Sequence, residues 1–561
     1  MPVQTKIVME RNVPATMRDG CVLYSDVYRP ADDLQHPVLL QRIPYGKGFL
    51  PFATYCLDVI VAAHAGYVVI VQDVRGRFES EGGLFYLYRD EFADGYDTVE
   101  WAASLPYSDG NVGMFGASYM GMTQWQAAVM RPPHLKAIFP CTAASGAYFY
   151  TGGAVEWGLL SNWTLTSIGP AALLRALPKQ PEVLADLVRL AGDLGDIERV
   201  FETLPLAEVT PKFAPWMREI LEHDEYDEFH RRLSVRGDQH REVEVPAFVF
   251  AGWYDCLIES DLQHFSSARS MGATEVARTG TRLMVGPWAH AAFWQAVGER
   301  NFGPAASGLF LKLQTDLTSL QLRWFDRWLR GIRNGIDEQP PVELFVMGQN
   351  RWRSENEWPL ARTKYTPWYL QPDGGLGPAP PAGAHSDAFA YDPRNPVPTR
   401  GGNHLLPAHY PRGPVDQREV EARADVLVYT SPVLENDLEV TGPVSAKLWA
   451  ASTAPSTDYT AKLVDVFPDG RAFNVCDGIV RVKEGAREPR EHTIELWATS
   501  NAFLRGHRVR VEISSSNFPR FDRNLNTGLS GRDSGETAIA NQTVFCAADR
   551  ASCIVLPVIE Q

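Results

Sequence analysis

The chain has 561 residues, of which 45% are hydrophobic and 22% charged, a composition that excludes a disordered or fibrous protein. Single hydrophobic cores stop growing at roughly 250–300 residues, so this length predicts two or three domains. The formal net charge of −15 excludes a general nucleic-acid-binding protein and one that docks on anionic membranes, because both need an excess of Lys and Arg.

No targeting or membrane segment is expected. The N-terminal sequence lacks the apolar run of a secretory signal, and no segment approaches the roughly 20 apolar residues that cross a bilayer. The seven cysteines are scattered and lack the CxxC spacing of a zinc site, which is typical of free thiols in a reducing compartment. We therefore expect a cytoplasmic protein without a metal site.

Strands and helices alternate in residues 1–144. The apolar runs at 37–46 and 67–76 are rich in Val, Ile and Leu and end in turn residues, as buried strands do. Segments with helical spacing follow each of these runs, at 52–66 and 93–106. This order predicts a mostly parallel sheet covered by helices.

The pattern changes twice further along the chain. Residues 145–240 are rich in helical patterns, whereas strand and helix alternation returns in residues 241–341. We therefore predict a helical cap inserted into one α/β domain. Residues 342–561 carry short alternating strands separated by turn clusters, which is typical of an all-β jelly roll. The expected fold class is α/β of the α/β-hydrolase type, with an inserted helical cap and a C-terminal jelly-roll domain.

The sharpest local feature is the segment GASYMG at 116–121, which follows an apolar strand and precedes a helix. Small residues around a serine at such a turn let the backbone bend sharply and expose the hydroxyl, as in a nucleophile elbow. The general G-x-S-x-G pattern has its second glycine at position 120, where this chain has Met120 and places the glycine at Gly121. The strand-turn-helix setting nevertheless favours Ser118 as a nucleophile over a surface turn.

A serine nucleophile needs a base, and the base needs an orienting carboxylate. In α/β-hydrolases these partners follow the serine in the order acid, then histidine, at the ends of later strands. The apolar segment 245–255 ends on Asp255, and the segment 281–290 ends on His290. An isolated Asp or His at a strand end is usually structural, but the correct order at two successive strand ends favours a triad with Ser118.

An acyl-transfer site also needs hydrogen-bond donors for the oxyanion. The geometry of the elbow offers the backbone N–H of Tyr119. The second donor usually comes from the loop after an early strand, and Tyr45 lies in such a turn at 44–46. Its hydroxyl is a candidate donor, and a packing role for the ring is an equal alternative.

Other polar segments are weaker candidates for a functional site. A buried ion pair that organises a strand end is the favoured role of the charges at 73–77, and the acidic run at 89–97 is interpreted as a solvated helix start. His404 and His409 are too isolated for a metal site. Because the chain has no GxGxxG or phosphate loop, no cofactor is expected.

Six segments, spread over most of the chain, together carry a resemblance to a known family: GASYMGMTQWQAAV, GWYD, GPWAH, LFVMGQNRWR, TAKLVDVFPDGRAF and SSSNFPRFDRNLNTG. They resemble the cocaine esterase group of the α/β-hydrolase family that also holds α-amino-acid ester hydrolases and Xaa-Pro dipeptidyl peptidases. The nucleophile motif of that family is G-x-S-Y-x-G, which accounts for the displaced glycine. The resemblance implies an α/β-hydrolase domain, a helical cap and a C-terminal jelly roll.

The resemblance also implies a role for each candidate: Ser118 as nucleophile, His290 as general base, Asp255 as orienting acid, and the Tyr45 hydroxyl and Tyr119 N–H as the oxyanion hole. For the acyl pocket it implies Trp163, and it places Leu257 and Leu406 where cocaine esterases have phenylalanines. Loss of these rings removes stacking surface for an aromatic acyl group. An aliphatic or smaller acyl group is therefore expected.

We thus predict a serine carboxylic ester hydrolase that acts on a small molecule through an acyl-enzyme. An amidase or acylase of the same family remains an alternative, because relatives that hold a substrate ammonium use nearby carboxylates. The segment 119–123 carries none, but Glu259 and Asp261 lie near the acid. A non-catalytic binding protein on the same scaffold is a further alternative, because fold alone does not give function. Neither nucleic acid nor membrane is an expected partner, and a homodimer is compatible with the sequence.

Overall fold

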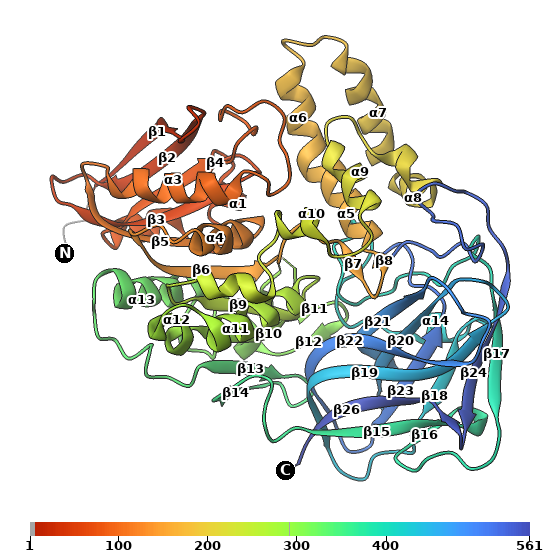
Figure 1. Ribbon diagram of the computed structural model, residues 1–561. Helices are drawn as coiled ribbons and strands as arrows, with labels where there is room; N and C mark the ends of the chain where they lie inside the picture. The colour runs from red at the N-terminus through yellow and green to blue at the C-terminus, as the bar shows by residue number, and fades with distance from the viewer. Residues whose placement is uncertain (1–5, 291, 561) are drawn as a thin grey trace.

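The computed structural model describes residues 6–290 and 292–560. The N-terminal half is built on a ten-stranded sheet with the strand order β1-β2-β4-β3-β5-β6-β9-β10-β13-β14 (Figure 1). All neighbours from β4 to β13 in this order are parallel, and the pairs at the two edges are antiparallel. This confirms the predicted mostly parallel sheet. Its strands are β1 (Ile7–Thr16), β2 (Val22–Pro30), β3 (His36–Ile43), β4 (Val68–Asp73), β5 (Ser108–Ser118), β6 (Leu135–Ala143), β9 (Phe248–Tyr254), β10 (Arg282–Ala289), β13 (Val342–Val346) and β14 (Arg351–Glu355).

Helices pack on this sheet in two groups. α3 lies beside α4, and α2 lies beside α13. The central strands are buried along nearly their whole length because helices cover them. None of the helices in the two described ranges is both long and apolar enough to cross a membrane. The helices of this half are α1 (Leu50–Ala53), α2 (Val59–His64), α3 (Glu91–Ala103), α4 (Tyr119–Val129), α11 (Ile258–Met271), α12 (Glu275–Gly280) and α13 (Leu317–Leu329).

A helical cap is inserted between β6 and β9. The hairpin of α6 and α7 projects from the body of the molecule, whereas α5 lies at its base, between the large sheet and the C-terminal β strands (Figure 1). The cap helices are α5 (Trp157–Trp163), a π-helical turn (Thr164–Ile168), α6 (Gly169–Ala176), α7 (Val183–Gly195), α8 (Ile197–Glu202), α9 (Pro215–Glu222) and α10 (Glu228–Arg231).

The C-terminal half is rich in β strands, paired almost entirely antiparallel around a hydrophobic core of its own. β13 and β14 are not part of it, because β13 pairs with β10 of the large sheet. These two strands, expected in the jelly roll, therefore join the large sheet, since an alternating pattern does not reveal which sheet a strand joins. The longer strands of the β-rich domain are β15 (Lys364–Gln371), β17 (Ser386–Tyr391), β18 (Leu427–Thr430), β19 (Leu438–Ser452), β20 (Thr457–Val466), β21 (Ala472–Val482), β22 (Arg490–Phe503), β23 (Arg508–Ser514), β24 (Ala540–Ala547) and β26 (Cys553–Ile559).

Candidate active site

Ser118 is the last residue of β5, and α4 begins at the next residue. The backbone of Ser118 has φ 59° and ψ −119°, a strained combination for a residue with a side chain. Gly116, with φ 130°, lies so close to the following helix that a Cβ there would meet the Cβ of Met120 at 2.6 Å. The sharp turn places the hydroxyl at the carboxyl end of the sheet, as a nucleophile elbow requires.

Asp255 and His290 lie beside this turn. They follow β9 and β10, which are parallel neighbours, so their carboxyl ends meet at one edge of the sheet. His290 Nδ1 lies 3.0 Å from each carboxylate oxygen of Asp255, and Nε2 lies 3.0 Å from Ser118 Oγ. Because a carboxylate only accepts hydrogen bonds, Nδ1 carries the ring proton and Nε2 is left to accept from the serine hydroxyl. The structure thus brings together the three residues that the sequence singled out.

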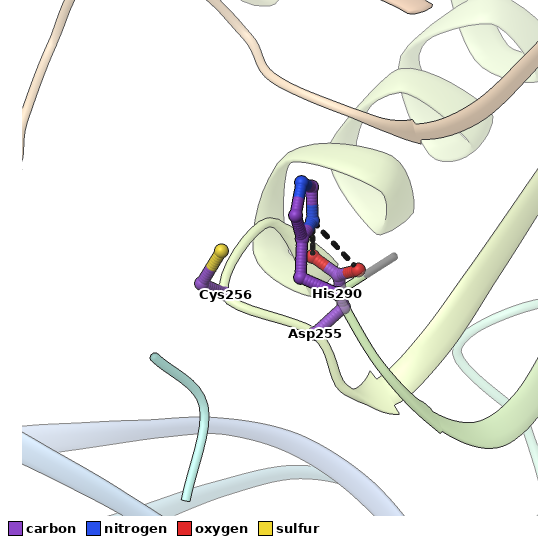
Figure 2. Close-up of side chains that lie close together, drawn as sticks. All are labelled: Asp255, Cys256 and His290. Carbon is purple, nitrogen blue, oxygen red and sulfur yellow. Dashed lines mark hydrogen bonds and ion pairs between the residues drawn. The ribbon is translucent and has the colours of Figure 1, made fainter. Parts of the chain in front are cut away.

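Figure 2 shows that the imidazole of His290 faces both oxygens of Asp255, while the thiol of Cys256 points elsewhere. These three side chains offer ligand atoms within 4.8 Å of one another. Both carboxylate oxygens are already engaged by the imidazole, and burial raises the pKa of the Cys256 thiol well above its ordinary value. The arrangement favours an acid–base pair over a metal site.

Tyr45 contacts Ser118 from the loop after β3. Its hydroxyl accepts a hydrogen bond from Trp163 Nε1 at 2.9 Å and is also hydrogen-bonded to Ser118. Burial raises the pKa of Tyr45 to about 12. Arg77 holds this turn, because its Nε donates to the carbonyl of Pro44 at 2.7 Å.

The buried ion pair expected at 73–77 therefore takes a different form. Arg77 binds backbone carbonyls, and Asp73 instead accepts from the backbone N–H of Lys47 at 2.7 Å and from its Nζ at 3.2 Å.

Tyr119 occupies the first position of α4, where the amide N–H has no acceptor within the helix. Its phenol donates to Glu91 Oε1 at 2.8 Å, and Arg42 Nη1 lies 2.5 Å from the other oxygen of that carboxylate. The solvated helix start expected at 89–97 is therefore wrong for Glu91 and Asp94, which are 3% and 2% exposed. These carboxylates turn inward to meet Arg42 and Arg75, a pairing that the local sequence does not reveal.

A pocket opens over Ser118, and the large-sheet domain, the cap and the β-rich domain all line it. Trp163 and Leu257 lie in its wall, as expected. Leu406 does not: it is fully buried against Gly158 of α5, and its neighbour Leu405 lines the pocket instead. Leu405 and Leu406 are the same residue type, so the sequence alone does not show which of them reaches the pocket.

Three charged side chains lie in the pocket wall: Glu156, Arg236 and Glu259. The sequence pointed only to Glu259, which lies near Asp255 along the chain, whereas Glu156 and Arg236 come from distant segments. Burial raises the pKa of Glu156 to about 7, although Arg520 lies 3.8 Å away. Glu259 lies 3.9 Å from Arg236. Asp261 does not reach the pocket, since it is fully buried and accepts from the backbone N–H of Ala143 at 2.8 Å.

Comparison with known proteins covers both halves of the chain. The family model of the X-Pro dipeptidyl-peptidase (S15 family) matches residues 19–292, and that of the X-Pro dipeptidyl-peptidase C-terminal non-catalytic domain matches residues 334–555. The cocaine esterase of Rhodococcus sp. (strain MB1 Bresler) is 40% identical over 98% of this chain and 98% of its own. A putative serine esterase of Mycobacterium tuberculosis is 25% identical over 90% of both chains.

Solved structures extend the likeness in fold. An aminopeptidase from the marine sediment archaeon Thaumarchaeota archaeon superposes with a TM-score of 0.81 at 23% identity, over 100% of this chain and 97% of its own. An α-amino acid ester hydrolase superposes with a TM-score of 0.77 at 22% identity, again over 100% and 97%. The chain therefore belongs to the S15 family of α/β-hydrolases, as a cocaine esterase-like member.

Proposed function

We propose that this enzyme hydrolyses carboxylic esters through a covalent acyl-enzyme on Ser118. The observation that carries the proposal is the continuous chain of hydrogen bonds from Ser118 Oγ through His290 to Asp255. A serine hydroxyl is a weak nucleophile unless a neighbouring base accepts its proton. His290 Nε2 is placed for that transfer, and the carboxylate of Asp255 stabilises the imidazolium that results.

In the first half of the reaction, Ser118 Oγ attacks the carbonyl carbon of the ester while its proton passes to His290 Nε2. The carbonyl oxygen becomes an oxyanion, which the Tyr45 hydroxyl and the Tyr119 N–H are proposed to stabilise. The tetrahedral intermediate then collapses: the bond to the alcohol oxygen breaks, and the imidazolium returns the proton to the departing alkoxide. The acyl group remains on Ser118.

In the second half, a water molecule takes the place of the alcohol. His290 Nε2 accepts a proton from the water as it attacks the acyl carbon, and a second oxyanion forms in the same hole. Collapse of this intermediate breaks the bond to Ser118 Oγ, which recovers its proton from His290. The carboxylic acid leaves and the free enzyme is restored.

An ester is favoured over an aminoacyl amide. Both pocket carboxylates that could hold a substrate ammonium lie near arginines, Glu156 near Arg520 and Glu259 near Arg236. The 40% identity to a cocaine esterase supports the same choice. The acyl side of the pocket carries Leu257 where cocaine esterases have a phenylalanine, so we propose an aliphatic or small acyl group.

The test is hydrolysis of p-nitrophenyl esters of increasing acyl length, beside p-nitrophenyl benzoate and an aminoacyl p-nitroanilide. We expect the short aliphatic esters to give the highest kcat/KM, and Ser118→Ala to abolish turnover. A wild-type enzyme that cleaves only the anilide would make it an amidase, and turnover by Ser118→Ala equal to wild type would remove Ser118 from the mechanism.

We further propose that the enzyme works in the cytoplasm on a small-molecule ester. All seven cysteines are free thiols, and six of them are buried. Free, unpaired thiols are typical of proteins kept in a reducing compartment.

A further inference from the structure

One loop of the β-rich domain, residues 402–413, reaches the ends of β9 and β10. Its two ends are paired: Gly402 N–H donates to the carbonyl of Gly413 at 2.7 Å, and Gly413 N–H donates back at 3.0 Å. Inside the loop, His404 Nε2 donates to the carbonyl of Pro411 at 3.2 Å, and its Nδ1 accepts from the N–H of Leu406 at 3.2 Å. Burial lowers the pKa of His404 to about 3, so the ring stays neutral and can make both bonds. The loop is closed and internally braced.

The first contact of this loop with the triad is made by Asn403, which is 3% exposed. Its amide Nδ2 donates to the carbonyl of Trp253 at 2.8 Å and to the carbonyl of Asp255 at 3.0 Å. The carbonyl of Trp253 lies where the register between β9 and β10 shifts, and the carbonyl of Asp255 lies just past the end of β9. A buried carbonyl outside a ladder needs another donor. Asn403 supplies one to both carbonyls, and the carbonyl of Asp255 also accepts from the N–H of Ile258 at 3.3 Å.

The second contact is made by Arg412 at the other end of the loop. Its Nη1 donates to the carbonyl of His290 at 3.1 Å, and its Nη2 donates to the carbonyl of Leu406 at 3.3 Å. One guanidinium therefore ties the backbone of the base to the loop that holds the backbone of the acid.

The third contact reaches the cap. Asn162 Nδ2 donates to the carbonyl of Leu405 at 2.8 Å. The next residue, Trp163, donates to the Tyr45 hydroxyl. The same loop thus touches the acid, the base and the helix that supports the proposed oxyanion donor.

We infer that the loop 402–413 is a positioning element of the active site, in which Asn403 and Arg412 fix the backbones of Asp255 and His290. The inference rests on the proposed function, and it gives a catalytic purpose to a domain whose family model is described as non-catalytic. Positioning acts on the reacting geometry rather than on substrate binding. A displacement of about 1 Å in such a site can lower the rate roughly 10²-fold.

The experiment compares two substitutions of the same kind. Asn403→Asp keeps the shape of the side chain but replaces its N–H donors by an oxygen that repels the carbonyls of Trp253 and Asp255. Asn526→Asp makes the same change at a buried asparagine remote from the triad, whose Nδ2 donates to the carbonyl of Ala538 at 2.8 Å. Kinetics on a short p-nitrophenyl ester and the Tm are measured for both, with wild type and Ser118→Ala as references.

We expect Asn403→Asp to lower kcat by about 10- to 100-fold with KM within about threefold of wild type, because the binding surface is intact while the acid is displaced. Asn526→Asp should lower the Tm with kcat unchanged. Arg412→Met removes the donors from a half-buried side chain and keeps its apolar stem, and it should also lower kcat at constant KM. If Asn403→Asp does not fold, Arg412→Met alone tests whether the loop positions the triad.

Two outcomes overturn the inference: wild-type kcat in folded Asn403→Asp or in Arg412→Met, or an equal loss of kcat in Asn526→Asp, which would mean general destabilisation. If Ser118→Ala is inactive, either result leaves the proposed function intact. An active Ser118→Ala would instead remove the proposed function itself.

Discussion

At the scale of single residues, Tyr45 and Tyr119 border Ser118, and the proposed oxyanion hole takes a different group from each. Tyr119 offers its backbone N–H, and its phenol is occupied by Glu91. Tyr45 offers its hydroxyl, and the raised pKa of about 12 keeps that hydroxyl protonated throughout the neutral range. Trp163 donates to the oxygen of Tyr45, which leaves the Tyr45 proton available for Ser118 or for an oxyanion.

Tyr45→Phe tests this role. We expect a loss in kcat of roughly 10²–10³ with little change in KM, because the hydroxyl is worth most when charge develops on the substrate oxygen. Tyr88→Phe is the matched control, since Tyr88 also lines the pocket and its ring stacks on Tyr119 at 4.5 Å. Equal kinetics of Tyr45→Phe and wild type would return Tyr45 to a packing role.

At the scale of elements, the position of α4 explains the glycine that departs from the general elbow motif. A Cβ at Gly121 would meet the Cβ of Ala143 at 2.7 Å and its Cα at 3.0 Å, both in β6. Glycine at 121 therefore lets α4 lie close against the sheet. Since Ser118 immediately precedes this helix, the approach of α4 to β6 also sets the place of this proposed nucleophile.

Gly121→Ala should therefore lower both the Tm and kcat. Overpacking costs about 1–3 kcal/mol, more than the roughly 1 kcal/mol that alanine gains over glycine from helix propensity. Gly192→Ala in α7 is the control, because a Cβ there has no neighbour within 4 Å and only the propensity gain applies. Thermal unfolding and p-nitrophenyl ester kinetics measure both. A Gly121→Ala enzyme as stable and active as wild type would contradict this account of the glycine.

At the scale of the whole molecule, the cap and the β-rich domain are joined by a buried cluster next to the pocket. Arg520, which is 1% exposed, lies 2.5 Å from Asp477 of β21 and 3.8 Å from Glu156 at the start of α5. Its guanidinium also lies 4.9 Å from the ring centre of Trp497 in the pocket wall. The cluster therefore links the substrate pocket to the packing of two domains.

Arg520→Met should lower the Tm, because it leaves two buried carboxylates without their cation, a change that costs about 3–5 kcal/mol. Arg471→Met is the contrast. Arg471 pairs with Asp469 at 2.8 Å on the surface, where both side chains are about half exposed, so its loss should leave the Tm unchanged. Equal Tm values for Arg520→Met and wild type would show that the cluster does not hold the domains together.

The sequence predicted most of the triad region because each of its members lies where a local pattern ends. Ser118, Asp255 and His290 follow apolar strands, and strand ends of a parallel sheet meet at one edge. What it missed depends on contacts between distant segments. Asn403 and Arg412 lie in a loop without any periodic pattern, and only the packing of the β-rich domain brings them to Asp255 and His290.

The same limit applies to strands and pocket residues. β13 has the alternation of the C-terminal strands, yet it pairs with β10 of the large sheet. Leu405 and Leu406 are indistinguishable in type, and only the fold decides which one lines the pocket. Glu91 looks like a surface acid until Arg42 and Tyr119 are seen beside it.

The most direct test of the acyl-enzyme on Ser118 is labelling with a fluorophosphonate probe, followed by mass spectrometry of the digested protein. We predict one probe per chain, attached to Ser118, with no labelling of Ser118→Ala and much slower labelling of His290→Ala. Labelling of Ser118→Ala to the same extent as wild type, or a folded wild-type enzyme that the probe does not modify, would contradict the account.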